Sequence, residues 1–166
     1  MPDGQVYTGN FVDWTRNGNG NLTWRNGDVF EGLWTSDQEG EGTITYSDGT
    51  IYVGQWKKDK RHGLGEMKYT HGGTYSGGFQ NGLKHGNGTY TWPDGAYYRG
   101  DFRNDRENGQ GLYHFSNGDR YSGSFRNGRL DGNGTYTWAS GTVFIGNVQL
   151  FASLIFIFAL GGTSKL

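Results

Sequence analysis

The sequence predicts an all-β protein: an elongated, single-layer, twisted antiparallel meander of about six β-hairpins, ending in a short apolar C-terminal segment. Three observations predict this fold. A unit of 23 residues, once 22, recurs along the chain; large and polar residues alternate within each unit; and Asn-Gly or Asp-Gly turn signals separate many of the units. With 32 Gly in 166 residues, 16% aromatic and only 33% hydrophobic residues, the composition suits a thin sheet better than a deep enzyme core.

The first strand of each unit carries an aromatic, a glycine and a second aromatic at alternate positions. Because successive side chains of a strand point to opposite faces, the two rings and the glycine share one face. The ring pairs are Tyr7 and Phe11, Phe30 and Trp34, Tyr52 and Trp56, Tyr75 and Phe79, Tyr98 and Phe102, and Tyr121 and Phe125. A seventh unit begins at Phe144 and is broken at Val148, so we expect six hairpins and a half repeat.

The returning strand of each unit carries two glycines, a large residue and an aromatic, again at alternate positions. These stretches are 18–24, 40–46, 63–69, 86–92, 109–115 and 132–138. Glycine weakens a strand, so we predict that each of these glycines leaves a slot for a ring from an adjoining strand. We assign the one missing residue of the second unit to its tip, TSDQE after Trp34, because loop tips tolerate deletions.

The dipeptides between units predict tight turns that set the strand register. They are Asn26-Gly27, Asp48-Gly49, Asp94-Gly95 and Asn117-Gly118. We expect both residues of each dipeptide at positions that need φ > 0, as in two-residue hairpin turns.

The spacing Tyr-x-Gly-x-Trp/Phe, then Gly-x-Gly, then Asp/Asn-Gly resembles the MORN (membrane occupation and recognition nexus) repeat over residues 1 to about 148. The resemblance implies an elongated meander of hairpins and a protein-binding role in cytoskeletal and ciliary assemblies. Similar arrays also precede lipid-kinase and methyltransferase domains. The alternative is therefore a membrane- or phosphoinositide-associated targeting or regulatory module of an enzyme system.

We divide the chain into a repeat array, 1–148, and an apolar tail, 149–166. The apolar residues 150–160 would make a helix of only about 17 Å, too short for a hydrocarbon core of about 30 Å. Three interpretations stay open for the tail: a cap over the last hairpin, a truncated or alternatively read product, or a membrane contact. The ending Ser164-Lys165-Leu166 matches the peroxisomal import tripeptide, and the two interpretations are a peroxisomal address or a coincidence.

Catalytic, cofactor and metal sites are not predicted, and we expect no enzyme. There is no cysteine, the four histidines lack ligand spacing, and no glycine pair is followed by the Lys-Ser/Thr of a phosphate-binding loop. Serines lack the arrangement of an acyl-transfer nucleophile. The net charge of −1 argues against nucleic acid, and MPDGQVYTG does not resemble a secretory signal, so we expect a cytoplasmic protein.

The twelve paired rings are the strongest candidate for a functional site. A single layer cannot bury both faces, so we expect the rings to form the repeat's minimal core and also a groove for a protein partner, with an amphipathic helix as the natural ligand. A homo-oligomer stays open. Lys57, Lys58, Lys60 and Arg61, near the tip of the third hairpin, suggest either a solvated loop or a contact with anionic lipid or an acidic partner.

Overall fold

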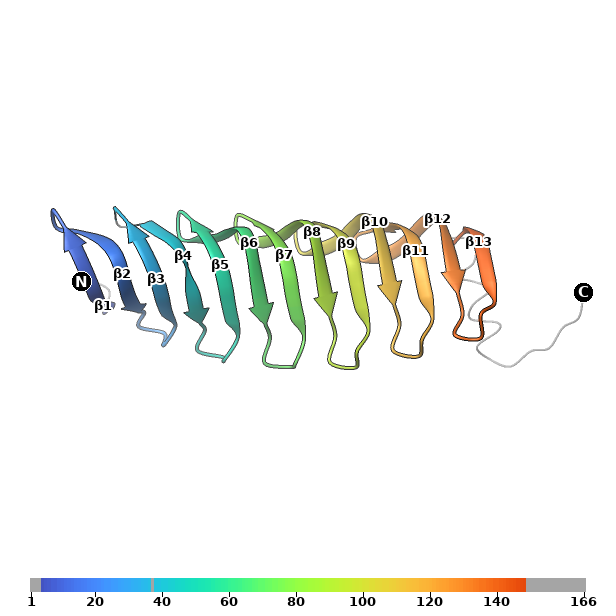
Figure 1. Ribbon diagram of the computed structural model, residues 1–166, viewed down its shortest axis with the longest axis horizontal. Coiled ribbons are helices and arrows are strands. Elements are labelled where there is room, and N and C mark those ends of the chain that lie inside the picture. The colour runs from blue at the N-terminus through green and yellow to red at the C-terminus, as the bar shows by residue number, and fades with distance from the viewer. Residues whose placement is uncertain (1–3, 37, 149–166) are drawn as a thin grey trace, which may run out of the picture.

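The chain forms one antiparallel sheet of 13 strands, in which every strand pairs with its neighbours in sequence (Figure 1). The computed structural model describes residues 4–36 and 38–148, and this part of the chain contains no helix. Six hairpins are followed by a thirteenth strand that begins a seventh unit. The predicted fold class is therefore confirmed, while the tail 149–166 lies outside the described residues.

The strands of the six hairpins alternate in length between seven and eight or nine residues. They are β1 (Val6–Val12), β2 (Thr15–Thr23), β3 (Val29–Thr35), β4 (Gln38–Thr45), β5 (Ile51–Lys57), β6 (Lys60–Lys68), β7 (Thr74–Gln80), β8 (Leu83–Thr91), β9 (Tyr97–Arg103), β10 (Arg106–His114), β11 (Arg120–Arg126), β12 (Arg129–Thr137) and the final β13 (Val143–Asn147).

Two kinds of turn connect the strands. At the tip of the β7–β8 hairpin, Asn81 and Gly82 both have positive φ, 53° and 87°, which is the type I′ geometry that matches the twist of paired strands. Between hairpins, the Gly95 N–H donates to the Trp92 carbonyl at 3.0 Å, and Gly95 has positive φ but Asp94 does not. The expectation of positive φ is thus correct for the glycine of each inter-repeat dipeptide and wrong for the residue before it, because this turn is longer than a two-residue hairpin turn.

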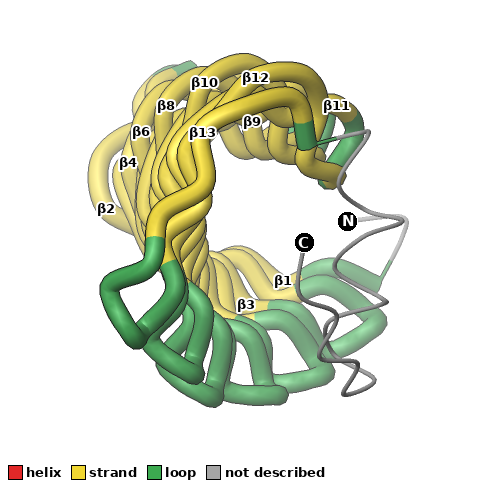
Figure 2. The backbone as a smooth tube through the Cα atoms, turned by 90° about the vertical axis from the view of Figure 1, so that its right-hand side faces the viewer, coloured by secondary structure: helices red, strands yellow, loops and turns green. Residues whose placement is uncertain are grey.

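A bulge in each hairpin bends the sheet. On β7 one residue separates Gly77 from Phe79, whereas three residues separate their partners, Gly88 and Lys84, on β8. Extra residues on one strand increase its local bend and twist. The strands are consequently bent, so that the sheet forms a trough with a C-shaped cross-section, as the view down its long axis shows (Figure 2).

The missing residue of the second unit lies in this bulge and not in the tip. Thr35 pairs with Gln38, so the tip keeps the two-residue loop of the other hairpins. The bulge between Glu39 and Gly42 holds two residues, where the corresponding bulges hold three. The tip assignment was wrong because a tip must keep its turn type to hold the register, whereas a bulge can lose a residue without changing the pairing beyond it.

Glycines serve two different purposes in each hairpin. The Tyr75 ring lies over Gly77 of its own strand and Gly88 of the next, where an added Cβ would come within 2.7 Å of the Tyr75 hydroxyl and ring atoms. Gly88 is a slot for a ring of the adjoining strand, as predicted, whereas Gly77 makes room for a ring of its own strand. Gly86, by contrast, has φ of 73° and only open space around an added Cβ, so the first glycine of the Gly-x-Gly pair permits the bulge and leaves no ring slot.

Candidate functional site: the aromatic inner face

The twelve paired rings form one continuous row along the sheet. The two rings of each strand pack edge to face against each other, and the first ring of each of the first five repeats also packs against the second ring of the next repeat, with centroids 4.8–5.5 Å apart and interplanar angles of 75–90°. Tyr75 and Phe79 are four residues apart, about 13 Å in a straight strand, yet their rings are 5.2 Å apart. The rings therefore lie on the concave side of the bent strands, which we call the inner face.

Most of this first row is core. Nine of the twelve rings are buried, Tyr7 and Trp56 are half-buried, and Phe11 at the N-terminal edge is 55% exposed. The tyrosines are further fixed by their hydroxyls, which donate to the carbonyl three residues on, as from Tyr52 to Gln55 at 2.9 Å. Burial raises the pKa of Tyr52 to about 12, against the opposing effect of Arg61.

A second row of rings, each one residue past the end of a returning strand, is more accessible. It has one member per repeat, each half-buried and packed against the core: Trp24, Tyr46, Tyr69, Trp92, Phe115 and Trp138. Consecutive members are two inter-strand spacings apart, a step of about 9.6 Å along the sheet. Sequence reasoning placed these aromatics on the correct face but did not assign them to the partner site, although their recurrence was as regular as that of the first row.

A hollow of about 440 Å³ opens beside this second row near the N-terminal end. Its lining includes Trp24, Tyr46, Trp56 and Asp28. The indole Nε1 of Trp56 is buried and has no hydrogen-bond partner in the described part of the chain, whereas Nε1 of Trp34 donates to the Gly20 carbonyl at 3.0 Å. The hollow thus brings aromatic side chains together with polar ones such as Asp28.

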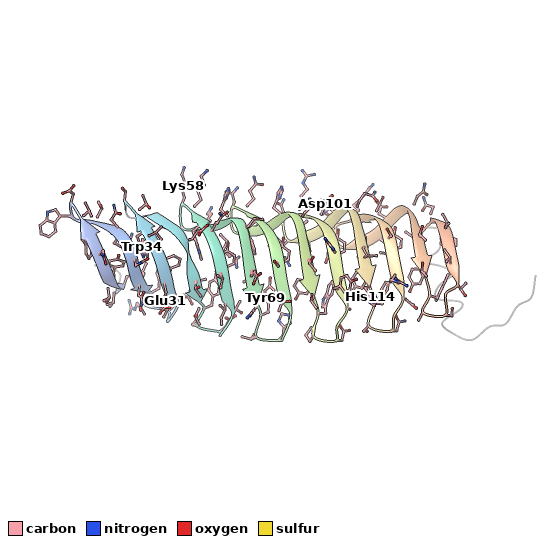
Figure 3. All side chains as sticks on the ribbon, in the orientation of Figure 1. Glu31, Trp34, Lys58, Tyr69, Asp101 and His114 are labelled. Carbon is pink, nitrogen blue, oxygen red and sulfur yellow. The ribbon has the colours of Figure 1, made fainter. Side chains whose placement is uncertain are left out.

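The structure divides the basic cluster of the third hairpin. Lys57, Lys58 and Lys60 are exposed at the β5–β6 tip, and Figure 3 shows Lys58 on that edge of the sheet. Arg61 instead lies on the inner face, where its Nη2 donates to the Gly82 carbonyl at 2.6 Å. Three of the four predicted residues are brought together, and the fourth is part of a different surface.

Cationic side chains lie over the rings of the inner face. The Arg61 Cζ is 5.7 Å from the Phe79 ring, and the Lys84 Nζ is 4.8 Å from the Tyr90 ring and 5.6 Å from the rings of Tyr75 and Phe102. Near the N-terminal end, the guanidinium of Arg16 lies 4.1 Å above the Trp34 ring. Burial lowers the pKa of Lys84, against the opposing effect of nearby acidic groups. Sequence reasoning missed Arg16 and Lys84, which alternation alone would have placed on this face.

Metal binding finds no support in the described ranges 4–36 and 38–148, where no group of three His, Cys, Asp or Glu side chains could hold an ion. The same residues contain no helix long and apolar enough to cross a membrane.

Comparison with known proteins places the chain in a family. A family model described as the MORN repeat matches residues 7–29, 30–51, 52–74, 75–97, 98–120 and 121–143, and the chain therefore belongs to the MORN-repeat family. No curated protein matches the chain.

A solved structure with a TM-score above 0.5 shares the fold. The SAS-4 (dCPAP) TCP domain of Drosophila melanogaster, described in complex with a proline-rich motif of Ana2 (dSTIL), is 14% identical, with a TM-score of 0.54 over 85% of this chain and 77% of that one. The TCP10 domain of Danio rerio CPAP, as its E1021V mutant, is 16% identical with a TM-score of 0.31 over 89% and 80%. At these identities the likeness concerns the fold alone.

Proposed function

We propose that this protein is a non-catalytic scaffold that binds a segment of another protein along its inner face. The observation that carries the proposal is the second row of half-buried aromatics, one per repeat from Trp24 to Trp138. Aromatic side chains that keep an accessible apolar surface are typical of protein-binding sites. The first row contributes indirectly, since its buried rings hold the curvature that presents the second row, and Trp56 and Phe11 extend the accessible surface.

An amphipathic helix is the partner segment that fits this row. Residues seven apart on one face of a helix are about 10.5 Å apart along its axis, close to the step of about 9.6 Å between repeats. One apolar residue per heptad can therefore meet one ring of the second row in each repeat. The TCP domain with a similar fold is described in complex with a proline-rich motif. An extended proline helix, with about 9.3 Å per three residues, is thus the competing ligand.

Binding of defined peptides tests the proposal. Titration calorimetry with a three-heptad amphipathic helical peptide should show saturable binding to the full chain, weakened at least about tenfold by Trp92→Ala. Val53→Ala provides the matched control, because Val53 is 50% exposed and points away from the inner face. Circular dichroism must show that both variants stay folded. Binding of a proline-rich peptide in place of the helical one would refute the helical partner and keep the scaffold, whereas binding of neither would refute both.

The assembly in which such a scaffold would work is cytoskeletal or ciliary, as the family membership supports. Imaging of the tagged full chain in ciliated cells tests this placement. Concentration at basal bodies or along microtubule-based structures is the expected result. Import into peroxisomes would instead favour the C-terminal Ser164-Lys165-Leu166 as an address.

Anionic membrane is a second candidate ligand, favoured by the joint exposure of Lys57, Lys58 and Lys60 at one tip, where Lys57 and Lys60 pair across the hairpin. Flotation with phosphatidylserine vesicles at two salt concentrations tests it. Salt-sensitive flotation that is lost when the three lysines become Gln is the expected result. Flotation that survives this change would show that the tip is not the lipid contact.

A further inference from the structure

A line of charged positions runs along the inner face beside the rings. Each second ring of a first strand pairs with a residue near the start of the returning strand, as Phe79 pairs with Lys84. This residue is the first of the returning strand on the same face as the ring. Charged residues stand at this position in the first, third, fourth and fifth repeats, namely Arg16, Arg61, Lys84 and Glu107, and the sixth repeat has Leu130. In the third, fourth and fifth repeats, the order of charges is positive, positive, negative. We call these three residues the inner charge row.

Lys84 is the central member, and its ammonium group is poorly solvated. Nζ lies 4.8–5.6 Å from the centroids of three rings, those of Tyr75, Tyr90 and Phe102. Burial lowers the pKa of the Lys84 amine. No ion pair joins Lys84 to another residue within the described part of the chain. Ring faces offset only part of the cost of removing an ammonium from water, and Asp105 and Glu107 act on Lys84 without forming an ion pair with it, so a carboxylate in direct contact would complement this position.

The neighbouring position also offers donors without a carboxylate. Arg61 donates from Nη2 to the Gly82 carbonyl, and its Nη1 lies 3.4 Å from the Met67 sulfur, a weak acceptor. Its register partner Trp56 has a buried indole Nε1 with no acceptor among the described residues. A guanidinium has five N–H donors, so beside these two contacts and its hydrogen bond with the Tyr46 hydroxyl Arg61 keeps donors for a planar acceptor such as a carboxylate.

Glu107 reverses the sign one repeat further on. It pairs with Phe102 across the β9–β10 hairpin and is half-buried. In the described residues Glu107, like Lys84, takes part in no ion pair. A partner segment lying along the inner face therefore meets two cations and then an anion, each about 9.6 Å from the next.

We infer that the partner segment carries two carboxylates one heptad apart, which bind Arg61 and Lys84, and a basic side chain a further heptad on, which binds Glu107. This inference rests on the proposed function, since it assigns charges to the same helical ligand. Charge complementarity at partly buried positions selects the register of a ligand and disfavours reversed charges. Apolar contacts with the second row alone would allow the helix to slide by one repeat, and the change of sign prevents that shift.

Three peptides separate this inference from the proposed function. All are three-heptad amphipathic helices with the same apolar face, and they differ only at three heptad-spaced positions: Glu-Glu-Lys, Lys-Lys-Glu or Gln-Gln-Gln. We expect the Glu-Glu-Lys peptide to bind the full chain about tenfold more tightly than the neutral one, and the Lys-Lys-Glu peptide to bind more weakly than either. Equal affinity of all three would overturn the charge assignment and leave the scaffold intact. Binding of none would overturn both.

Variants of the protein localise the effect. Lys84→Gln should remove about tenfold of the preference for the Glu-Glu-Lys peptide, whereas Lys68→Gln, exposed on the outer face of β6, should leave it unchanged. Lys84→Glu should weaken binding of the Glu-Glu-Lys peptide, and changing the matching Glu of the peptide to Lys should restore the affinity. The two changes together should show a coupling energy that neither change shows alone. Circular dichroism and thermal unfolding show whether each variant is folded. A preference that persists in folded Lys84→Gln would refute the assignment.

Discussion

Gly88→Ala should destabilise the protein although it adds only one methyl group. A Cβ at Gly88 would lie 2.6 Å from Cε2 and 2.7 Å from Cζ of Tyr75, so the ring must move. Displacement weakens two edge-to-face contacts, with Phe79 and Phe102, each worth about 1 kcal/mol, and the hydrogen bond to the Gly78 carbonyl, worth about 1 kcal/mol. Alanine recovers about 0.5–1 kcal/mol by restricting the unfolded chain, so we expect a net loss of about 2 kcal/mol in the free energy of unfolding.

Urea unfolding followed by tryptophan fluorescence and circular dichroism measures this loss. Gly40→Ala is the matched control: φ at Gly40 is not positive, and the nearest atom to an added Cβ is the Leu33 carbonyl oxygen at 3.4 Å, an ordinary contact. We expect it to change the free energy of unfolding by less than about 0.5 kcal/mol. Adding Tyr75→Phe to Gly88→Ala should not restore stability, because the clashing ring carbons remain. Equal stability of the two glycine variants would refute the slot interpretation.

Three further predictions follow from the inner face. Phe30→Tyr should raise the free energy of unfolding by about 1 kcal/mol, because the new hydroxyl can donate to the Leu33 carbonyl as the tyrosines of the row donate to the carbonyl three residues on. The measurement is the urea midpoint, and an unchanged midpoint would contradict this role of the hydroxyls. The pKa of Tyr52 is raised to about 12 in the folded protein, so as pH rises through about 10 the unfolded state releases the Tyr52 proton first. The free energy of unfolding should therefore fall between pH 10 and 12. If tyrosinate absorbance of Tyr52 rose near pH 10 while the circular dichroism spectrum stayed intact, this reasoning would be wrong. Asp119→Ala should lower the free energy of unfolding by about 2 kcal/mol, since the buried carboxylate accepts a hydrogen bond of 2.7 Å from the Tyr136 hydroxyl. Thermal unfolding measures the loss, and a loss no larger than that caused by replacing an exposed tip aspartate would show that the bond contributes little.

The fold could be predicted because its signals are local and repeated. Alternation assigned the rings and slot glycines such as Gly88 to one face, and the turn glycines fixed where each hairpin ends. The curvature could not be predicted, because it depends on the bulge. In the sequence Gly86 resembles Gly88, two residues on, but only its positive φ shows that it bends the strand. Without the curvature, sequence reasoning could not tell that the first row would be largely buried and the second row accessible.

The binding site was predicted only in part for the same reason. Arg61 was grouped with the lysines of the tip because they are adjacent in sequence, yet alternation from the tip turn places Lys60 and Arg61 on opposite faces. The inner charge row depends on pairings between strands, such as Phe79 with Lys84, that depend on the tip turn. Alternation could have placed Arg16 and Lys84 on the inner face, but which ring each residue pairs with depends on the tip turn and needed the structure.

The edge-to-face row links each repeat only to its neighbours, so the stability of the array depends on contacts between adjacent repeats. Every ring touches rings only in its own repeat and in an adjacent one, from Phe11 at one end to Tyr121 near the other. Stability is then transmitted step by step between neighbours, and a weak step in the middle divides the array into two parts that unfold separately. A partner that spans several repeats ties these steps together. Its length would therefore decide how much of the array resists unfolding or force as a single unit.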